Sequence, residues 1–253
     1  MTRPRLGQHF LKRDSVLRRI AGAACPQTEP LVVEVGPGMG ALTAHLLTRS
    51  QRVIAIELDP GLCCRLTEKY LLEPRFQLVE GDASEMDLAQ WGPAVIAGNL
   101  PYYAATPILR KVAHLVGPSV LRAVFLIQRE VADRLTARPG TREYGYLTVE
   151  TQCFCHAELL FPVPPAAFRP PPKVESAVVL LTPHRPTAEI PVSQPDRFLQ
   201  FAGHCFQQKR KTLRNNLLPH YPKQAVDSLP QGRLRAEQLT IQELADVYRR
   251  LVG

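Results

Sequence analysis

The sequence lacks the features that mark membrane-spanning, secreted and metal-cluster proteins. No apolar run approaches the roughly 18 residues that a membrane-spanning helix needs, and the N-terminal segment has no uninterrupted apolar stretch typical of a secretory signal. The six cysteines form no C-x-x-C pair, so their spacing suits neither a zinc site nor a disulfide framework. We therefore expect a cytoplasmic protein with reduced thiols, no bound metal and no membrane partner.

Acidic residues are scarce relative to basic ones, with 23 Asp and Glu against 31 Lys and Arg and a formal net charge of +8. The basic residues gather near the two ends. Six lie between Arg3 and Arg19, where Asp14 is the one acid, and ten lie from Asp196 onward against five acids. A solvated helix face would explain the cluster "QQKRKTLRNN" alone, but two basic ends favour a nucleic-acid partner.

Short apolar runs alternate with helical patterns through the first two-thirds of the chain. This alternation predicts a doubly wound, mostly parallel α/β sheet. We expect strands at 31–35, 52–58, 76–81, 94–99, 122–128, 153–163 and 173–181, and helices at 41–49, 60–71, 105–116 and 129–137.

Two proline-rich segments interrupt the alternation. Residues 161–173 contain six prolines, which forbid a helix and predict a stiff, extended loop. Residues 182–195 contain four more and predict an interdomain linker. Helical patterns follow at 196–208, 211–218 and 240–252, the last with a capping box of Thr240 and Glu243. The predicted domains are therefore 1–185, an α/β domain, and 186–253, a small helical domain.

Glycines and carboxylates follow the predicted strands at one sheet edge. In "VEVGPGMGA", Gly36 and Gly38 would let a ligand approach the backbone and a helix N-terminus. Glu57 ends the second strand, where it could accept hydrogen bonds from a ribose, and Asp82 follows the third. This pattern fits NAD or S-adenosylmethionine (SAM). Two features favour SAM: Glu34 within the first strand, and Asp82 after the third, which suits an adenine amine. A plain glycine turn with surface acids is the alternative.

The fourth strand ends abruptly in "NLPYY". An amino group on a nucleobase is a poor nucleophile because its lone pair is delocalised into the ring. The side-chain oxygen of Asn99 and the main-chain carbonyl of Leu100 or Pro101 could accept its two N–H bonds and direct the lone pair at a methyl donor. Tyr102 offers a face on which the base can stack, worth about 1–3 kcal/mol. A strand-ending turn with a packed tyrosine is the alternative.

"NLPYY" resembles the signature of exocyclic-amine methyltransferases. Together with "GQHFL", "VEVGPGMGALT", "IELD", "GDA", "LIQREVADRL", "FRPPPKVESAV" and "HCFQQKRKTLRNNL", in that order, it makes the chain similar to the KsgA/RsmA family of small-subunit rRNA adenine dimethyltransferases. The resemblance runs from about Gly7 to Leu217. It implies a Rossmann-like class I SAM methyltransferase domain with a mostly parallel seven-stranded sheet, followed by a small all-helical domain.

The resemblance also implies roles for individual residues. Phe168 would sandwich the extruded adenine opposite Tyr102, although a buried core residue beneath the proline-rich loop is the alternative. His9 stands where the family often has Asn, and a phosphate contact and a surface position are the alternatives for this residue. Tyr103 replaces a residue that is commonly polar. The implied cofactor-binding residues are His9, Leu11, Gly36, Gly38, Glu57, Asp82, Ala83 and Asn99, and the implied catalytic residues are Asn99, Leu100, Pro101, Tyr102 and Phe168.

The expected activity is SAM-dependent dimethylation of two adjacent adenosines in the 3′-terminal hairpin loop of small-subunit (16S) rRNA. The partner would be the immature small ribosomal subunit, bound through the basic C-terminal domain by a monomer. Three alternatives stay open at this point. They are a large-subunit rRNA adenine methyltransferase of the macrolide-resistance type, a non-catalytic RNA-binding assembly factor and a nicotinamide oxidoreductase.

Overall fold

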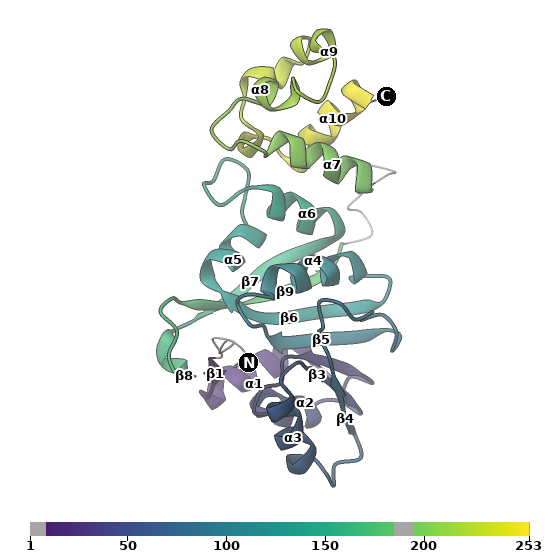
Figure 1. The fold of residues 1–253 in the computed structure, drawn as a ribbon, viewed down its shortest axis with the longest axis vertical. Coiled ribbons are helices and arrows are strands. Elements are labelled where there is room, and N and C mark those ends of the chain that lie inside the picture. The colour runs from purple at the N-terminus through teal and green to yellow at the C-terminus, as the bar shows by residue number, and fades with distance from the viewer. Residues whose placement is uncertain (1–8, 185–194, 253) are drawn as a thin grey trace, which may run out of the picture. The chain divides into compact units, whose positions relative to one another are not determined.

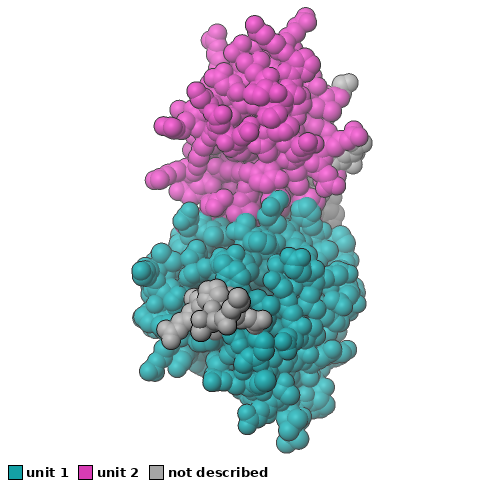
Figure 2. Space-filling view, viewed as in Figure 1, with its two compact units in different colours: residues 1–132, 155–183 teal, residues 133–154, 184–253 magenta. Residues whose placement is uncertain are grey.

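The computed structural model describes residues 9–184 and 195–252. Several predictions fall outside these residues. They concern Arg3, Arg5 and Gly7, residues 185–194 of the predicted linker, and the predicted domain boundary at 185/186. The chain divides into two compact units, which are coloured separately in Figure 2. Unit 1 contains residues 1–132 and 155–183, and unit 2 contains residues 133–154 and 184–253.

Unit 1 is built on a seven-stranded sheet in the order β4-β3-β2-β5-β6-β9-β7 (Figure 1). The strands from β4 to β6 are parallel, and β9 runs antiparallel to both of its neighbours. The predicted mostly parallel, seven-stranded sheet is confirmed. The strands are β2 (Val32–Val35), β3 (Val53–Glu57), β4 (Phe76–Glu80), β5 (Ala94–Asn99), β6 (Val120–Gln128), β7 (Cys155–Val163) and β9 (Ser176–Pro183).

Three helices connect consecutive parallel strands: α2 (Ala41–Leu47), α3 (Pro60–Lys69) and α4 (Ala105–Leu115). Helix α1 (Asp14–Ala24) precedes β2, and α5 (Arg129–Leu135) follows β6. In α1, Leu17, Ile20 and Ala21 are buried in a cluster with α2 and with β-strand residues such as Val95 and Val124. This spacing is the helical one, because residues three and four apart share a face. Helix α1 was not predicted.

The predicted proline-rich loop is more structured than expected. One turn of 3₁₀ helix occupies Pro165–Ala167, which proline tolerates at a helix start, and the prediction of a wholly extended loop is wrong there. The next two residues form β8 (Phe168–Arg169), which pairs antiparallel with β1 (Phe10–Leu11). This two-stranded ribbon holds the N-terminal segment against the proline-rich segment.

Unit 2 is helical and has its own core. Its elements are α6 (Tyr146–Phe154), α7 (Pro195–Cys205), α8 (Leu213–Leu217), α9 (Lys223–Asp227), α10 (Ile241–Val252) and 3₁₀ turns at Pro230–Arg233 and Ala236–Gln238. Phe198 and Phe201 of α7 are fully buried and lie against Tyr248 of α10. The capping box before α10 is present, because Glu243 accepts from the backbone N–H of Thr240 and the Thr240 hydroxyl accepts from that of Glu243.

The boundaries of the two units differ from the predicted ranges 1–185 and 186–253. Residues 133–154 belong to unit 2, because Tyr144, Val149 and Cys153 are buried in its apolar cluster. The predicted strand 153–163 therefore begins two residues later, after α6 ends at Phe154. Within the described ranges, none of the helices has the length and apolar character to cross a membrane.

Candidate active site

The carboxyl ends of four adjacent strands of unit 1 open into one cavity of about 760 Å³. This is the sheet edge at which open α/β folds bind ligands. All twelve residues predicted for the site line the cavity: His9, Leu11, Gly36, Gly38, Glu57, Asp82, Ala83, Asn99, Leu100, Pro101, Tyr102 and Phe168.

The glycine loop after β2 leaves no room for side chains beside the cavity. Gly36 and Gly38 have φ values of 69° and 57°, in the left-handed region that disfavours a side chain. A Cβ on Gly36 would lie 3.3 Å from the main-chain oxygen of Asn99. A Cβ on Gly38 would lie 3.2 Å from the ring of Phe10. Glycine therefore lets the loop, β5 and β1 approach each other closely.

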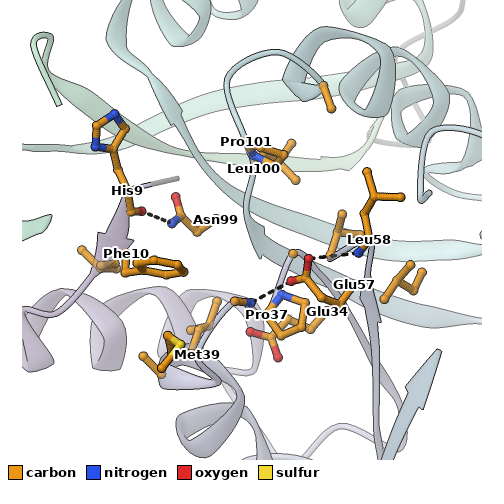
Figure 3. Close-up of a pocket in the computed structure, with 18 of the residues that line it drawn as sticks. His9, Phe10, Glu34, Pro37, Met39, Glu57, Leu58, Asn99, Leu100 and Pro101 are labelled. Atoms are coloured by element: carbon orange, nitrogen blue, oxygen red, sulfur yellow. Dashed lines mark hydrogen bonds between the residues drawn. The ribbon is translucent and has the colours of Figure 1, made fainter. Parts of the chain in front are cut away.

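Glu57 organises the first two loops of the cavity. One carboxylate oxygen accepts the backbone N–H of Gly38 at 3.0 Å, and the other accepts those of Leu58 and Asp59 at 2.9 and 3.0 Å. Figure 3 shows this carboxylate between the glycine loop and Leu58. The side chain is buried, so these bonds fix its orientation toward the cavity.

Asp82 starts a tight turn after β4. Its Oδ1 accepts both the backbone N–H and the hydroxyl of Ser84, at 2.8 and 2.7 Å. Its main-chain oxygen accepts the N–H groups of Glu85 and Met86 at 3.0 Å each. No described residue donates to Oδ2, so this oxygen can accept a hydrogen bond from a ligand.

Glu34 is a buried acid that also lines the cavity. Burial raises the pKa of its carboxyl group to about 8, an effect that the hydrogen bond from the Thr43 hydroxyl at 2.6 Å partly offsets. The negative charge of Glu57 acts in the same direction as burial. Glu34 can therefore carry a proton near neutral pH.

The side-chain amide of Asn99 has a defined orientation. Its Nδ2 donates to the main-chain oxygen of His9 at 3.1 Å, as Figure 3 shows. The carbonyl oxygen Oδ1 is thereby left as an acceptor for a ligand. The Pro101 main-chain oxygen accepts the N–H of Ala104 at 3.0 Å, whereas no described residue donates to that of Leu100.

Aromatic side chains lie beside these acceptors. The hydroxyl of Tyr102 lies 3.2 Å from that of Ser176 on β9, which anchors the ring. The His9 ring lies 5.7 Å from the Tyr102 ring and is hydrogen-bonded through Nδ1 to the Pro170 carbonyl at 2.8 Å. Tyr103 is 55% exposed at the cavity, and partial burial, followed by the charges of Asp82 and Glu57, raises the pKa of its phenol.

Phe168 is 6% exposed and belongs to the apolar cluster of unit 1 while lining the cavity. Its burial fits the alternative of a core residue, and its role in stacking on an adenine stays a prediction. It lies opposite Leu11 in the β1–β8 ribbon. Because Lys12 and Arg13 also donate their N–H groups to the Ala167 carbonyl, the ribbon holds Phe168 at a fixed place.

Residues 1–251 match the protein family described as ribosomal RNA adenine dimethylase. The chain belongs to the ribosomal RNA adenine dimethylase family. Among its relatives are proteins named ribosomal RNA small subunit methyltransferase A. The one from Acidobacterium capsulatum is 41% identical, covering 98% of this chain and 91% of the relative. The one from Chlorobium luteolum is 40% identical, covering 97% and 88%.

Solved structures of similar fold include a dimethyladenosine transferase from Plasmodium falciparum. It is 25% identical, with a TM-score of 0.80 and coverage of 94% of this chain and 96% of that chain. The 23S rRNA methyltransferase ErmE is 27% identical, with a TM-score of 0.75 and coverage of 96% and 100%. The adenine dimethylase family and the class I methyltransferase fold exclude the oxidoreductase alternative.

Several cavity residues were not predicted. Phe10 stands between the two predicted residues His9 and Leu11, and its ring contact with Gly38 depends on a strand of only two residues. Met39 and Leu58 are 43% and 38% exposed, which is unusual for large apolar residues and is explained by their place in the cavity. Each of these three residues directly follows a predicted site residue in the sequence, and this adjacency could have identified it as a cavity residue.

Proposed function

We propose that this dimethylase transfers methyl groups from SAM to the exocyclic N6 amine of two adjacent adenosines in the 3′-terminal hairpin loop of small-subunit rRNA. The observation that supports the proposal is the hydrogen bond from Asn99 Nδ2 to the main-chain oxygen of His9, which leaves Oδ1 of this cavity residue as an acceptor for a ligand. The identity of 40–41% to small-subunit methyltransferases supports this rRNA as the substrate.

The residues of the cavity fit SAM along its length. The glycine loop is proposed to lie under the methionine part, and the lack of side chains at Gly36 and Gly38 supports this. Glu57 is proposed to accept hydrogen bonds from the ribose hydroxyls, and Asp82 Oδ2, to which no described residue donates, to accept one from the adenine amine. His9, Leu11 and Ala83 complete the proposed cofactor-binding set. When bound, SAM supplies a methyl group on a cationic sulfur, which makes the thioether a good leaving group.

The proposed work of the protein is to hold the target amine. Asn99 Oδ1 accepts one N–H of the amine, and a main-chain oxygen accepts the other. The Pro101 carbonyl already accepts from Ala104, so Leu100 is favoured for this role. With both N–H bonds held, the nitrogen becomes pyramidal and its lone pair is free to attack. Because positioning supplies most of the rate, no strong general base is required, and the proton leaves to water.

Stacking is proposed to hold the extruded adenine between Tyr102 and Phe168. Both rings line the cavity, and each is fixed by the protein before the base arrives, Tyr102 through Ser176 and Phe168 through the β1–β8 ribbon. Rings that are already ordered lose little side-chain entropy on binding. Pro101 restricts the backbone φ angle of this turn and has no N–H to donate.

The basic residues of unit 2 are proposed to bind the rRNA backbone. Lys209, Arg210 and Lys211 are exposed in the segment between α7 and α8. The proposal implies a monomeric cytoplasmic enzyme that acts on the immature small subunit without a metal ion. Binding through such cations should weaken steeply as salt rises.

The test is methylation of immature small subunits by the purified protein with labelled SAM, using Asn99→Ala. We expect this variant to lose turnover by at least about 100-fold, since a hydrogen bond made in the transition state is removed, and to keep rRNA affinity within a few-fold. Gln90→Ala, which truncates an exposed amide that donates to Asp87, is the matched control and should keep full activity.

Three outcomes would contradict the proposal. Full turnover by Asn99→Ala would refute the role of the amide. Methylation of large-subunit rRNA in place of small subunits would favour the second candidate, which the likeness to ErmE supports. Binding of SAM and rRNA by the wild-type protein with no methylation would favour a non-catalytic assembly factor.

A further inference from the structure

Lys111 on α4 binds the turn that carries Asp82. Its ammonium donates to the main-chain oxygens of Ser84 at 2.7 Å and Met86 at 2.6 Å. The side chain is half-buried, so water competes for the ammonium less than at an exposed site. Hydrogen bonds from a charged donor are about twice as strong as neutral ones. Lys111 is thus a fixed attachment rather than a solvated surface cation.

The two partners of Lys111 also hold Asp82. Ser84 donates its N–H and its hydroxyl to Asp82 Oδ1, and Met86 donates its N–H to the Asp82 main-chain oxygen. Each residue therefore faces Asp82 with its donors and Lys111 with its carbonyl. Removing Lys111 would free both carbonyls, and the turn that holds Asp82 at the cavity would lose this attachment to α4.

Helix α4 connects this attachment to the other side of the cavity. The helix begins at Ala105, two residues after the segment Asn99–Tyr103, and Ala104 and Ile108 line the cavity. Lys111 therefore fixes the cofactor side of the cavity to the element that carries the amine-binding residues. Lys69 on α3 makes a comparable pair of bonds, to the main-chain oxygens of Met39 and Gly40 at 3.0 Å each, but it is exposed.

We propose that Lys111 is a positioning residue for cofactor recognition, which acts through Ser84 and Met86 to hold Asp82 toward the adenine of SAM. The inference rests on the proposed function, because it takes the ligand of Asp82 to be SAM. It assigns Lys111 to the affinity for the cofactor and not to methyl transfer, since its ammonium bonds Ser84 and Met86 of the 82–86 turn.

The first experiment compares SAM binding by calorimetry and steady-state kinetics for wild type, Lys111→Met and Lys111→Arg. Lys111→Met is expected to raise the Kd and the KM for SAM about tenfold, the size expected for losing hydrogen bonds to a charged group. Its kcat at saturating SAM should stay within about twofold of wild type, because no reacting atom is touched. Lys111→Arg, which retains a charged donor, should recover most of the affinity.

The control is Arg52→Met, which removes one cation at the opposite, amino edge of the sheet, where Arg52 bonds Gln77. This variant should bind SAM as wild type does. A melting curve confirms that each variant is folded. If Lys111→Met does not fold, Lys111→Arg and Lys111→Gln carry the same comparison, with the neutral donor of Gln expected to give the weaker binding.

A second experiment tests whether the effect passes through Asp82. In an Asp82→Ala background, adding Lys111→Met should change the Kd for SAM by less than about twofold, since coupled residues are not additive. Additive losses, an unchanged Kd for Lys111→Met alone, or a loss in kcat with unchanged KM would each overturn the inference. A wild-type protein that binds no SAM would instead overturn the proposed function itself, so the two failures are distinguishable.

Discussion

Glu34 is a carboxylic acid inside a parallel sheet, and its surroundings determine its charge. In the folded protein, burial raises its pKa to about 8, above the ordinary value of 4.5 that an unfolded chain approaches. Between these two values the folded state holds a proton that the unfolded state releases. Raising the pH through this window therefore favours unfolding, and the stability contributed by the protonated carboxyl is lost by about pH 8.

Glu34→Gln should remove this pH dependence, because the amide does not titrate. The stability of the variant relative to wild type is expected to increase by on the order of 2–4 kcal/mol between about pH 5 and pH 8. Urea unfolding at both values measures the difference. Parallel pH profiles for the two proteins would show that Glu34 is ionised throughout the range.

Single residues also show what the sequence could predict. Asn99, Glu57 and Asp82 each end or follow a predicted strand, and parallel strands bring their carboxyl ends to one edge, so the cavity lining was predictable. Phe10 was not, since its place depends on pairing with Arg169, far away in the sequence. The Asn99 side chain donates to the main-chain oxygen of His9. Every residue type has such an oxygen, so this contact could not be predicted from the sequence.

At the scale of elements, the register between β2 and β5 depends on Gly98. It lies opposite Val35, and a Cβ on Gly98 would approach the main-chain oxygen of Val35 to 2.2 Å. Main-chain atoms in the middle of a sheet cannot move aside without breaking the ladder. The absence of a side chain at Gly98 therefore lets β2 and β5 pair at their carboxyl ends.

Gly98→Ala should destabilise the protein by more than about 3 kcal/mol or prevent folding. Gly22→Ala provides the matched control, because a Cβ there meets nothing within 4 Å and the residue lies within α1. That variant should gain about 0.5–1 kcal/mol from the higher helix propensity of alanine. Equal stabilities by urea unfolding would refute the proposed close approach.

Helices α1 and α6 were not predicted, for different reasons. The apolar spacing of α1 is visible in Val16, Leu17, Ile20 and Ala21, but the helix also carries adjacent exposed basic residues, which are equally typical of a binding segment. Helix α6, with the sequence "YLTVETQCF", is rich in β-branched residues that favour strands. Its burial within unit 2 outweighs that preference, which is a tertiary effect that local patterns do not contain.

At the scale of the whole molecule, the charge of unit 2 gives a test of rRNA binding. Arg210 and Lys211 are exposed, whereas Arg214 is paired with Asp227 at 2.7 Å. Each cation that neutralises a phosphate contributes close to one unit to the slope of log affinity against log salt.

Replacing Arg210 and Lys211 together by Gln should weaken binding of a small-subunit rRNA fragment and lower the salt slope by about 1.5–2. Arg214→Gln should leave the slope nearly unchanged, since its charge is already compensated. Filter binding over a range of salt concentrations measures both. A double variant with the wild-type slope would exclude this segment from the rRNA interface.

The chain passes between the two units three times, at 132/133, 154/155 and 183/184. Neither unit can therefore be excised as a continuous gene fragment. A piece that ends near the proline-rich stretch would retain Tyr144, Val149 and Cys153 without the α7 and α10 side chains that cover them. Grafting unit 2 onto another protein, or expressing it by itself, would require a gene in which a linker joins 133–154 to 195–252 in place of the residues between them.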